Sequence, residues 1–444
     1  MSWLLGLLPQ ASRAAAFVYY RVRYAGDPVP RRGPVLLVAN HPNSLLDPML
    51  VVAAAGRPVR FLAKAPLFAD PKTSWLVKSA GAIPVYRKVD DPALVDRNED
   101  AFRAVYAALA DGAAVGIFPE GLSHSEPSLA PLKTGAARMA LGGARQAGAP
   151  FAVVPVGLLL TRKDVFRSEA LVLTGPPVPW DDLASRGPDD AAAVRELTER
   201  VAGGLKRVTV NLETWQDRPL VESVVAIWEA EAGVADDPAA RVSRMEAATE
   251  ILAAARRHED ADAEALATAV EKHRRRLSRL RLDPRDVRAD VGFSGALGWT
   301  VRRVHLALPL AALLGAAGFV AFYPPYRVTG WLVGRVKLKE DERSTWKLLL
   351  GIVVYGLWLL ASGIAAWAWW GWFAAALVLV LLPALGLIGL AIRERWHGAW
   401  GDARRFFLLR SRRALVASLL AEQRHLAERL QALYERYRAA PELR

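Results

Sequence analysis

The sequence predicts an α/β fold: a largely parallel sheet flanked by helices, followed by a helical insert and a C-terminal α-helical membrane domain. Three observations support this prediction. Short apolar runs alternate with longer stretches of helical spacing over residues 34–174, which is typical of parallel sheets with crossover helices. Residues 191–287 are rich in Ala, Arg and Glu, with apolar residues at helical spacing. Long apolar segments follow residue 304.

The composition narrows the class of partner. The net charge of +13 indicates acidic partners such as nucleic acid, anionic lipid or phosphorylated substrates. Hydrophobic residues make up 53% of the chain and concentrate after residue 304, which favours lipid headgroups and phosphorylated substrates over nucleic acid. Because the chain has no cysteine, disulfides, thiolate metal sites and a covalent thioester on the protein are excluded.

Residues 1–28 are predicted to form a helix that lies in the membrane interface. Residues 3–24 combine Trp, Leu, Phe and Tyr with three arginines, which is typical of such helices. A buried first helix is the alternative. A signal peptide is disfavoured because residues 1–8 lack a basic start and Pro9 interrupts the apolar run.

Residues 29–190 are predicted to form the sheet domain. The Pro-, Asp- and Gly-rich stretch 176–190 ends the sheet region, and turns such as Asp111-Gly112 close the preceding helices. We expect strands at residues 35–39, 59–63, 82–86, 114–118, 151–156 and 170–174, and helices at residues 44–55, 93–110 and 135–147.

Two charged helical regions are predicted outside the sheet. Residues 191–300 are expected to form a charged hairpin or bundle. Its basic run 273–276 fits either a solvated helix face, the commoner case, or a contact with anionic headgroups. Residues 396–444 are expected to form a basic amphipathic tail, with one helix over residues 404–438.

Residues 301–395 are predicted to form the membrane domain. Segments 348–367 and 373–392 are each long enough to cross a bilayer, and residues 368–372 between them fit an aromatic turn at its surface. The outer ends of this hairpin are basic, so the positive-inside rule predicts that both face the cytoplasm. Segment 304–323 is basic at both ends and stops at Pro324-Pro325, which favours a re-entrant or in-plane helix pair over a full span.

The segment Asn40-His41-Pro42-Asn43-Ser44-Leu45-Leu46-Asp47-Pro48 directly follows an apolar, strand-like run. His41 and Asp47 would lie on different faces of one helix, so they meet only if His41 lies on the turn before the helix. There they would form a general-base pair, in which the aspartate supports the imidazolium. An equally good alternative is that Ser44 and Asp47 form a capping box and His41 is an ordinary turn residue.

Two further polar clusters also follow apolar runs. Phe118-Pro119-Glu120-Gly121-Leu122-Ser123-His124-Ser125 leads to Lys133 just before a predicted helix, and could hold a polyol and its phosphate. The run 81–88 ends in the basic pair Arg87-Lys88, and arginine binds phosphate bidentately. Each cluster alone is also compatible with ordinary surface loops. A fourth run, 154–157, carries no reactive group and is expected to shape a groove.

The positions of these clusters favour a single site. His41, Lys64, Arg87 and Glu120 each lie one or two residues past a predicted strand. Ligands of open α/β sheets bind outside the carboxyl ends of the strands. We therefore expect these four side chains to lie along one crevice.

The order of four motifs resembles that of the glycerolipid acyltransferase superfamily, which includes lysophosphatidate acyltransferases. The motifs are Asn-His-x-Asn-Ser-x-x-Asp, Gly-x-Ile-Pro-Val-x-Arg, Phe-Pro-Glu-Gly and Val-Pro-Val-Gly, and the resemblance covers about residues 30–180. Two departures stand out: five residues separate His41 from Asp47 where four are usual, and Leu-Ser-His follows Phe-Pro-Glu-Gly in place of Thr-Arg-Ser. Both resemble the fungal-type branch that acylates glycerol 3-phosphate or dihydroxyacetone phosphate.

The resemblance implies His41 as the base, Asp47 as its partner, and Arg87 with the Glu120 loop (including Gly121 and Ser123) at the acceptor phosphate. It implies direct transfer from acyl-CoA or acyl carrier protein to a phosphorylated glycerol acceptor, with Lys64 and Lys133 neutralising phosphate charge. The sequence shows no metal-ligand cluster, and no cofactor besides the acyl donor is expected. An integral membrane enzyme with its catalytic domain on the cytoplasmic face is predicted.

Other functions fit the same sequence. The acceptor could be lysophosphatidate or another lysophospholipid. A non-catalytic membrane lipid-binding protein is a rival from another class, although the intact histidine, aspartate, glutamate and arginine argue against it. A transporter is disfavoured because the segments after residue 348 are almost purely apolar.

Overall fold

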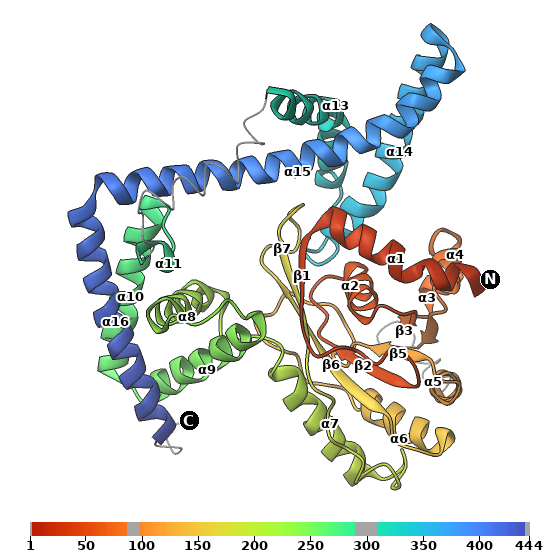
Figure 1. Ribbon diagram of the computed structural model, residues 1–444. Coiled ribbons are helices and arrows are strands. Elements are labelled where there is room, and N and C mark those ends of the chain that lie inside the picture. The colour runs from red at the N-terminus through yellow and green to blue at the C-terminus, as the bar shows by residue number, and fades with distance from the viewer. Residues whose placement is uncertain (1, 87–97, 289–308, 440–444) are drawn as a thin grey trace. The chain divides into compact units, whose positions relative to one another are not determined.

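The computed structural model describes residues 2–86, 98–288 and 309–439 (Figure 1). The chain divides into two compact units. The first, which we call the catalytic unit because it contains the candidate residues His41 and Asp47, comprises Met1–Asp217, Asp236–Thr249 and Lys339–Thr345. The second, the helical unit, comprises Arg218–Ala235, Glu250–Leu338 and Trp346–Arg444.

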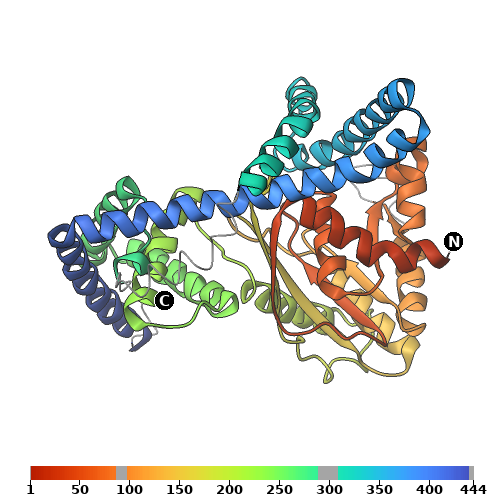
Figure 2. The ribbon, with the colours of Figure 1, turned by 45° about the horizontal axis from the view of Figure 1, so that its top comes forward.

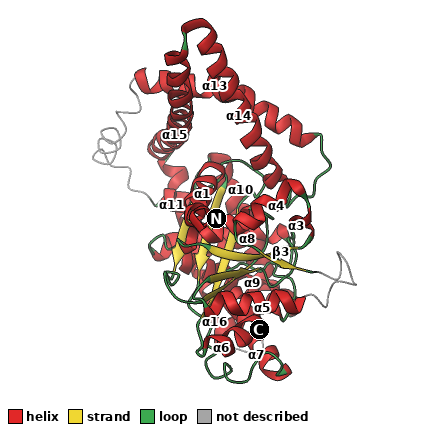
Figure 3. Cartoon of the chain, turned by 90° about the vertical axis from the view of Figure 1, so that its right-hand side faces the viewer, coloured by secondary structure: helices red, strands yellow, loops and turns green. Residues whose placement is uncertain are grey.

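The catalytic unit is built on a seven-stranded sheet in the order β1-β7-β6-β2-β5-β3-β4. Every pair of neighbouring strands is parallel except β6 and β7. Helices cover both faces of the sheet (Figures 1 and 3), and the expected largely parallel α/β fold is confirmed. The strands are β1 (Arg21–Gly26), β2 (Val35–Ala39), β3 (Val59–Lys64), β4 (Ile83–Val85), β5 (Ala114–Ile117), β6 (Ala152–Leu160) and β7 (Glu169–Thr174).

The helices of the catalytic unit follow the predicted alternation with the strands. A predicted helix at 93–110 begins outside the described residues and is observed from Asn98. The helices are α1 (Ser2–Tyr19), α2 (Leu46–Ala55), α3 (Pro66–Ala69), α4 (Pro71–Ser79), α5 (Asn98–Ala110), α6 (Gly135–Ala147) and α7 (Ala191–Lys206).

The N-terminal segment differs from the prediction. The helix ends at Tyr19, and β1 pairs in parallel with β7, so residues 21–26 belong to the sheet that was expected to begin after residue 28. The cause is long-range pairing: β1 is an edge strand held by β7, and local sequence carries no sign of that partner. Tyr19 and Tyr20 are buried at the junction between helix and strand.

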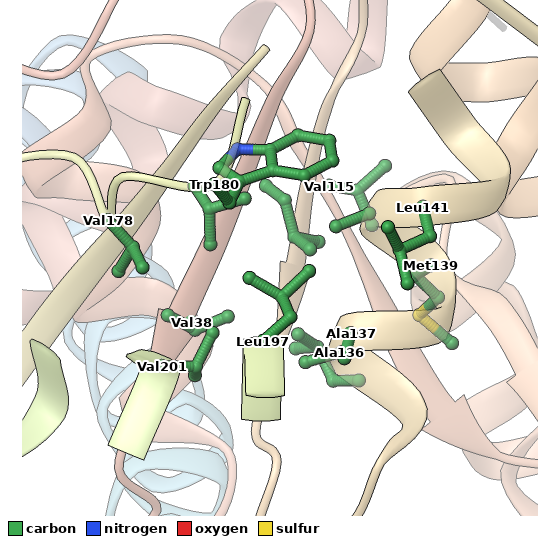
Figure 4. Close-up of a cluster of buried hydrophobic side chains, with 14 of the residues drawn as sticks. Val38, Val115, Ala136, Ala137, Met139, Leu141, Val178, Trp180, Leu197 and Val201 are labelled. Atoms are coloured by element: carbon green, nitrogen blue, oxygen red, sulfur yellow. The ribbon is translucent and has the colours of Figure 1, made fainter. Parts of the chain in front are cut away.

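One core cluster of the catalytic unit lies between the sheet and α5, α6 and α7. Val38 of β2, Val115 of β5, Leu141 of α6 and Leu197 of α7 meet in this cluster (Figure 4). Trp180 closes it, with its indole N–H donating to the Phe151 carbonyl at 2.9 Å. Since α7 is part of this core, the boundary expected at residue 190 is wrong: α7 completes the sheet domain.

The helical unit buries the charged region against the C-terminal tail. Ile227 of α8 (Arg218–Ala232), Leu266 of α10 (Ala261–Leu280) and Leu426 of α16 (Arg413–Ala439) form one apolar cluster. The remaining helices here include α9 (Pro238–Arg257), whose first part belongs to the catalytic unit, and α11 (Pro284–Val287). The single tail helix expected over 404–438 is interrupted at Arg412, where α15 gives way to α16.

The basic run 273–276 is engaged within this unit. His273 is fully buried. Arg274 and Arg275 pair with Glu271 at 2.7 and 2.8 Å, and Arg276 pairs with Glu422 of α16 at 2.6 Å. These contacts favour a structural role for the run.

Two described helices are long and apolar enough to cross a membrane: α14 (Arg343–Trp370) and α15 (Trp372–Ser411). They contain the two predicted spans, and Gly371 alone separates them, with φ at +85°. The aromatic turn expected over 368–372 is therefore shorter than predicted, because both helices continue into it.

A third apolar helix, α13 (Pro309–Gly334), lies beside α15 (Figures 1 and 2). It runs through Pro324 and Pro325, so the predicted stop at these prolines is wrong. The Thr329 hydroxyl donates to the Pro325 carbonyl, inside the helix. A re-entrant placement of this segment stays a prediction.

Candidate active site

His41 and Asp47 meet at the carboxyl end of β2. The strand ends at Ala39, the chain turns over residues 40–45, and Asp47 lies in the first turn of α2. The His41 Nδ1 donates to Asp47 Oδ2 at 2.8 Å, and the Asn43 backbone N–H donates to the same oxygen at 2.6 Å. The alternative capping box does not form: the residue that caps α2 is Leu45, without a side-chain hydrogen bond, and Ser44 has φ at +46°.

The environment of Asp47 suits a carboxylate that supports a histidine. Its side chain is fully buried, and burial raises the pKa of the Asp47 carboxyl. The hydrogen bond and charge of His41, the Asn43 N–H and the charge of Lys163 oppose that rise in pKa. Because Asp47 accepts from Nδ1, the lone pair of His41 lies on Nε2, which has no hydrogen-bond partner among the described residues.

The His41 ring is held flat against an aromatic stack. Its ring centre lies 3.9 Å from that of Phe118, with 9° between the planes, and Phe118 stacks in turn on Phe61 of β3 at 5.3 Å. Gly116, which pairs with Phe61 across β3 and β5, leaves the space that the Phe61 ring fills. The His41 side chain retains 18% of its exposure, so its outer edge is open to a substrate.

Glu120 joins the loops that follow β2 and β5. Its carboxylate is buried and accepts from the His41 backbone N–H at 2.9 Å, from the Ala130 N–H at 2.8 Å and from the His124 ring. The hydrogen bond to Glu120 raises the pKa of His124. Both carboxylate oxygens of Glu120 thus have protein partners, which gives this residue a part in fixing the backbone of His41; its predicted contact with substrate stays a proposal.

The other predicted residues of this loop lie around Glu120. Gly121 has φ at +78°, a conformation that favours glycine, and the Lys133 side chain packs over it. Lys133 is exposed, and its backbone N–H donates to the Pro119 carbonyl at 2.8 Å. The Ser123 hydroxyl lies 3.1 Å from that of Ser44.

The structure brings together only part of the predicted phosphate site. Lys64 is exposed at the end of β3, which is separated from β2 by β5 alone, so its strand lies about 10 Å from that of His41. Arg87 lies outside the described residues. The parallel pairing of β2, β5 and β3 does place the carboxyl ends of these strands at one edge, as expected.

Lys163 lies beside the candidate site and was not among the predicted residues. Its ammonium donates to the Pro42 carbonyl at 3.3 Å and to the Ser125 hydroxyl, so it joins the turn of His41 to the loop of Glu120. The predicted strand ended at residue 156, whereas β6 reaches Leu160. A longer strand would have placed Lys163 just past a strand end, with the other candidates.

Two polar residues of the turn are also structural supports. Asn40 exchanges two hydrogen bonds with the backbone of Leu158 on β6, at 3.1 and 2.7 Å. Asn43 is fully buried, and its amide donates to the Tyr20 hydroxyl at 2.5 Å. In the part of the chain that the structure describes, no group of His, Asp and Glu has the arrangement of a metal site.

A largely parallel α/β sheet with a carboxylate-supported histidine at its carboxyl edge has an arrangement that base-catalysed enzymes of the α/β class use. A model of the Acyltransferase family matches residues 21–159, which hold this site. Lyso-ornithine lipid O-acyltransferase of Pseudomonas aeruginosa is 30% identical over 211 residues, 46% of this chain and 73% of that protein. The chain belongs to the acyltransferase family.

Other relatives match a shorter part. Glycerol-3-phosphate O-acyltransferase 2 of Saccharomyces cerevisiae is 33% identical over 135 residues, 30% of this chain. The match spans 18% of the length of that yeast protein and 17% of a second one, glycerol-3-phosphate O-acyltransferase 1. A crystal structure of the 1-acyl-sn-glycerophosphate acyltransferase PlsC from Thermotoga maritima aligns with 45% of this chain and 78% of that one, at 19% identity and a TM-score of 0.33.

Proposed function

We propose that this protein transfers an acyl group from acyl-CoA or acyl carrier protein to a hydroxyl of glycerol 3-phosphate or dihydroxyacetone phosphate. The observation that carries the proposal is the hydrogen bond of 2.8 Å between His41 and Asp47. Within the described residues it leaves Nε2 of a partly exposed imidazole without a hydrogen-bond partner, as a general base requires. Membership of the acyltransferase family supplies the reaction class.

The reaction proceeds without a covalent intermediate on the protein. His41 Nε2 takes the proton of the acceptor hydroxyl while the acceptor oxygen attacks the thioester carbonyl carbon. Asp47 supports the imidazolium that forms. When the tetrahedral intermediate collapses, the carbon–sulfur bond breaks and the thiolate leaving group takes the proton from the imidazolium.

The choice of a phosphorylated acceptor has its support in nearby cations. Lys163 contacts the turn of His41 directly, and Lys133 covers Gly121 in the neighbouring loop. The spacing of His41 and Asp47 and the Leu-Ser-His continuation after Gly121 resemble the fungal-type branch. Two yeast glycerol-3-phosphate O-acyltransferases match 30% and 28% of this chain. We propose that Lys163 joins Lys64, Arg87 and Lys133 in neutralising the acceptor phosphate.

A lysolipid acceptor is the second candidate. The observation that favours it is the longer match to lyso-ornithine lipid O-acyltransferase, which covers 73% of that protein. A hydroxyl on a lysolipid would meet the same base, so His41 and Asp47 keep their roles in either case.

The test is acyl transfer from labelled palmitoyl-CoA by the purified full chain. Glycerol 3-phosphate, dihydroxyacetone phosphate, lysophosphatidate and a lyso-ornithine lipid are offered separately. Monoacyl product from either small phosphate is expected. Product from a lysolipid alone would instead support the second candidate, a lysolipid acceptor. A bound lysolipid without product under any condition would favour the non-catalytic alternative.

His41→Ala is expected to abolish transfer while the protein stays folded, because the general base is lost. The matched control is His258→Ala, since His258 is exposed and outside the site. Substantial turnover by the His41 variant would contradict the assigned base.

A further inference from the structure

The segment Lys339–Thr345, far from the site in sequence, belongs to the catalytic unit. Its last three residues are the first of α14, one of the two helices able to cross a membrane. Asp341 is 7% exposed and Ser344 is fully buried, unusual for polar residues in a short loop and helix start. Their hydrogen-bond partners lie in the His41 turn and in the loop of Glu120.

Four hydrogen bonds join this segment to that turn and its neighbour loop. The Ser123 hydroxyl donates to Asp341 Oδ2, and the Ser44 hydroxyl lies 3.4 Å from the same oxygen. The Ser344 hydroxyl donates to Asn43 Oδ1. The Leu45 backbone N–H donates to the Thr345 hydroxyl at 3.3 Å.

The turn that receives these bonds needs external support. Ser44 has φ at +46°, in the left-handed region that non-glycine residues rarely adopt. Such a conformation persists where its surroundings fix it from several sides. The Asn43 side chain is hydrogen-bonded to the hydroxyls of Tyr20 and Ser344. Its backbone N–H donates to the Asp47 carboxylate and orients it.

We propose that Asp341, Ser344 and Thr345 are positioning residues for acyl transfer: they hold residues 43–45 in place and, through them, the His41–Asp47 pair. The inference rests on the proposed function for its catalytic readout. Its consequence is that the sheet domain is incomplete without a segment that continues into a membrane helix. Within the described residues no hydrogen bond joins Asp341 to either proposed catalytic side chain, and it acts through Ser44 and Ser123.

The test uses Asp341→Ala and Asp341→Ala/Ser344→Ala in the full chain, purified in detergent or lipid nanodiscs. The matched control is Glu342→Ala, because Glu342 is the next carboxylate and its side chain has no hydrogen bond within the described residues. We expect kcat to fall about 10- to 100-fold in the double variant, since misplaced catalytic groups cost rates of this order. The KM for the acyl donor and the kcat of the control should stay within about twofold of the parent.

A second readout is independent of catalysis. Hydrogen–deuterium exchange of the peptide covering residues 40–50 should be faster in the double variant than in the parent or the control, because the side-chain bonds at Asn43 and Ser44 are lost. Asp341→Asn keeps the size and one acceptor oxygen, and should give an intermediate kcat. It replaces the alanine variants if these fail to fold.

Each result decides the proposal. A double variant with kcat within about twofold of the parent would overturn it. So would a fall in kcat with unchanged exchange at residues 40–50, since Asp341 would then act by contacting substrate. A parent that acylates none of the four acceptors would refute the proposed function, and the exchange comparison alone would then show whether the segment holds the turn.

Discussion

In the proposed mechanism the carboxylate of Asp47 holds the His41 ring and stabilises the imidazolium that forms on it. We expect Asp47→Asn to lower kcat by about 10²- to 10⁴-fold with little change in folding, because the amide keeps the size but not the charge. The assay is the same acyl transfer, with thermal melting to check the fold. Asp111→Asn, in an exposed turn, is the control; a variant retaining most of the parent kcat would contradict the support assigned to Asp47.

The His124–Glu120 pair makes a prediction about pH. The hydrogen bond to Glu120 raises the pKa of His124 above its ordinary value of 6.5. A histidine whose pKa is higher in the folded state stabilises the fold fully below the unfolded pKa, and the contribution is lost as pH rises through the folded pKa. The melting temperature of the parent should therefore exceed that of His124→Gln most at acidic pH, and the difference should shrink as pH rises.

The control for this pH series is His258→Gln, whose histidine is exposed. The difference in melting temperature between this variant and the parent should stay nearly constant over the same pH range. If the difference in melting temperature between the parent and His124→Gln grew with pH, its pH dependence would be opposite to the prediction. The His124–Glu120 pair would then be excluded as its source.

At the scale of elements, the strands that local sequence predicts are those with dense apolar runs. β2 is buried along its whole length and was predicted with its observed bounds, as was α6. β1 and the end of β6 escaped prediction because each owes its extent to pairing with β7. Because the predicted strand ended before β6 does, Lys163 was not recognised as a residue near a strand end. The error in the strand boundary therefore left Lys163 out of the predicted site.

The packing of α13 on α15 depends on glycine. A Cβ added at Gly318 would lie 2.6 Å from the Leu385 carbonyl oxygen and 3.0 Å from the Gly389 Cα, which are backbone atoms that cannot move aside cheaply. Gly318→Ala should therefore lower the melting temperature in detergent, with a cost of about 1–3 kcal/mol for overpacking.

Gly330 on the same helix is the matched control, since an added Cβ there meets nothing within 4 Å. Alanine is also the better helix former, so Gly330→Ala should leave the melting temperature unchanged or higher. Equal changes at the two positions would show that α13 and α15 do not pack through Gly318.

At the scale of the whole molecule, the sequence predicted the order of its parts but not which segments share a unit. The Lys339–Thr345 segment was interpreted only as a basic flank of a membrane span, because its partners at Asn43 and Ser44 lie about 300 residues away. The pair His41 and Asp47, in contrast, is close in sequence and could be predicted from a strand-to-turn pattern.

The α14–α15 hairpin carries a prediction about orientation. Its outer ends are basic, with Lys337, Lys339 and Arg343 on one side and Arg393 and Arg395 on the other, and its tip at Trp369, Trp370 and Trp372 is exposed and aromatic. The positive-inside rule places both outer ends in the cytoplasm. Because Arg343 is also part of the catalytic unit, the same orientation would hold the acyl-transfer site on the cytoplasmic side.

The natural absence of cysteine makes this orientation directly measurable. Ala368→Cys at the tip should react with a membrane-impermeant thiol reagent added to intact cells. Lys337→Cys and Arg395→Cys, both exposed at the outer ends, should react only after the membrane is opened. Labelling of the outer positions in intact cells would show that the hairpin has the opposite orientation. His41 would then lie on the other side of the membrane, and a cytoplasmic donor such as acyl-CoA would be excluded.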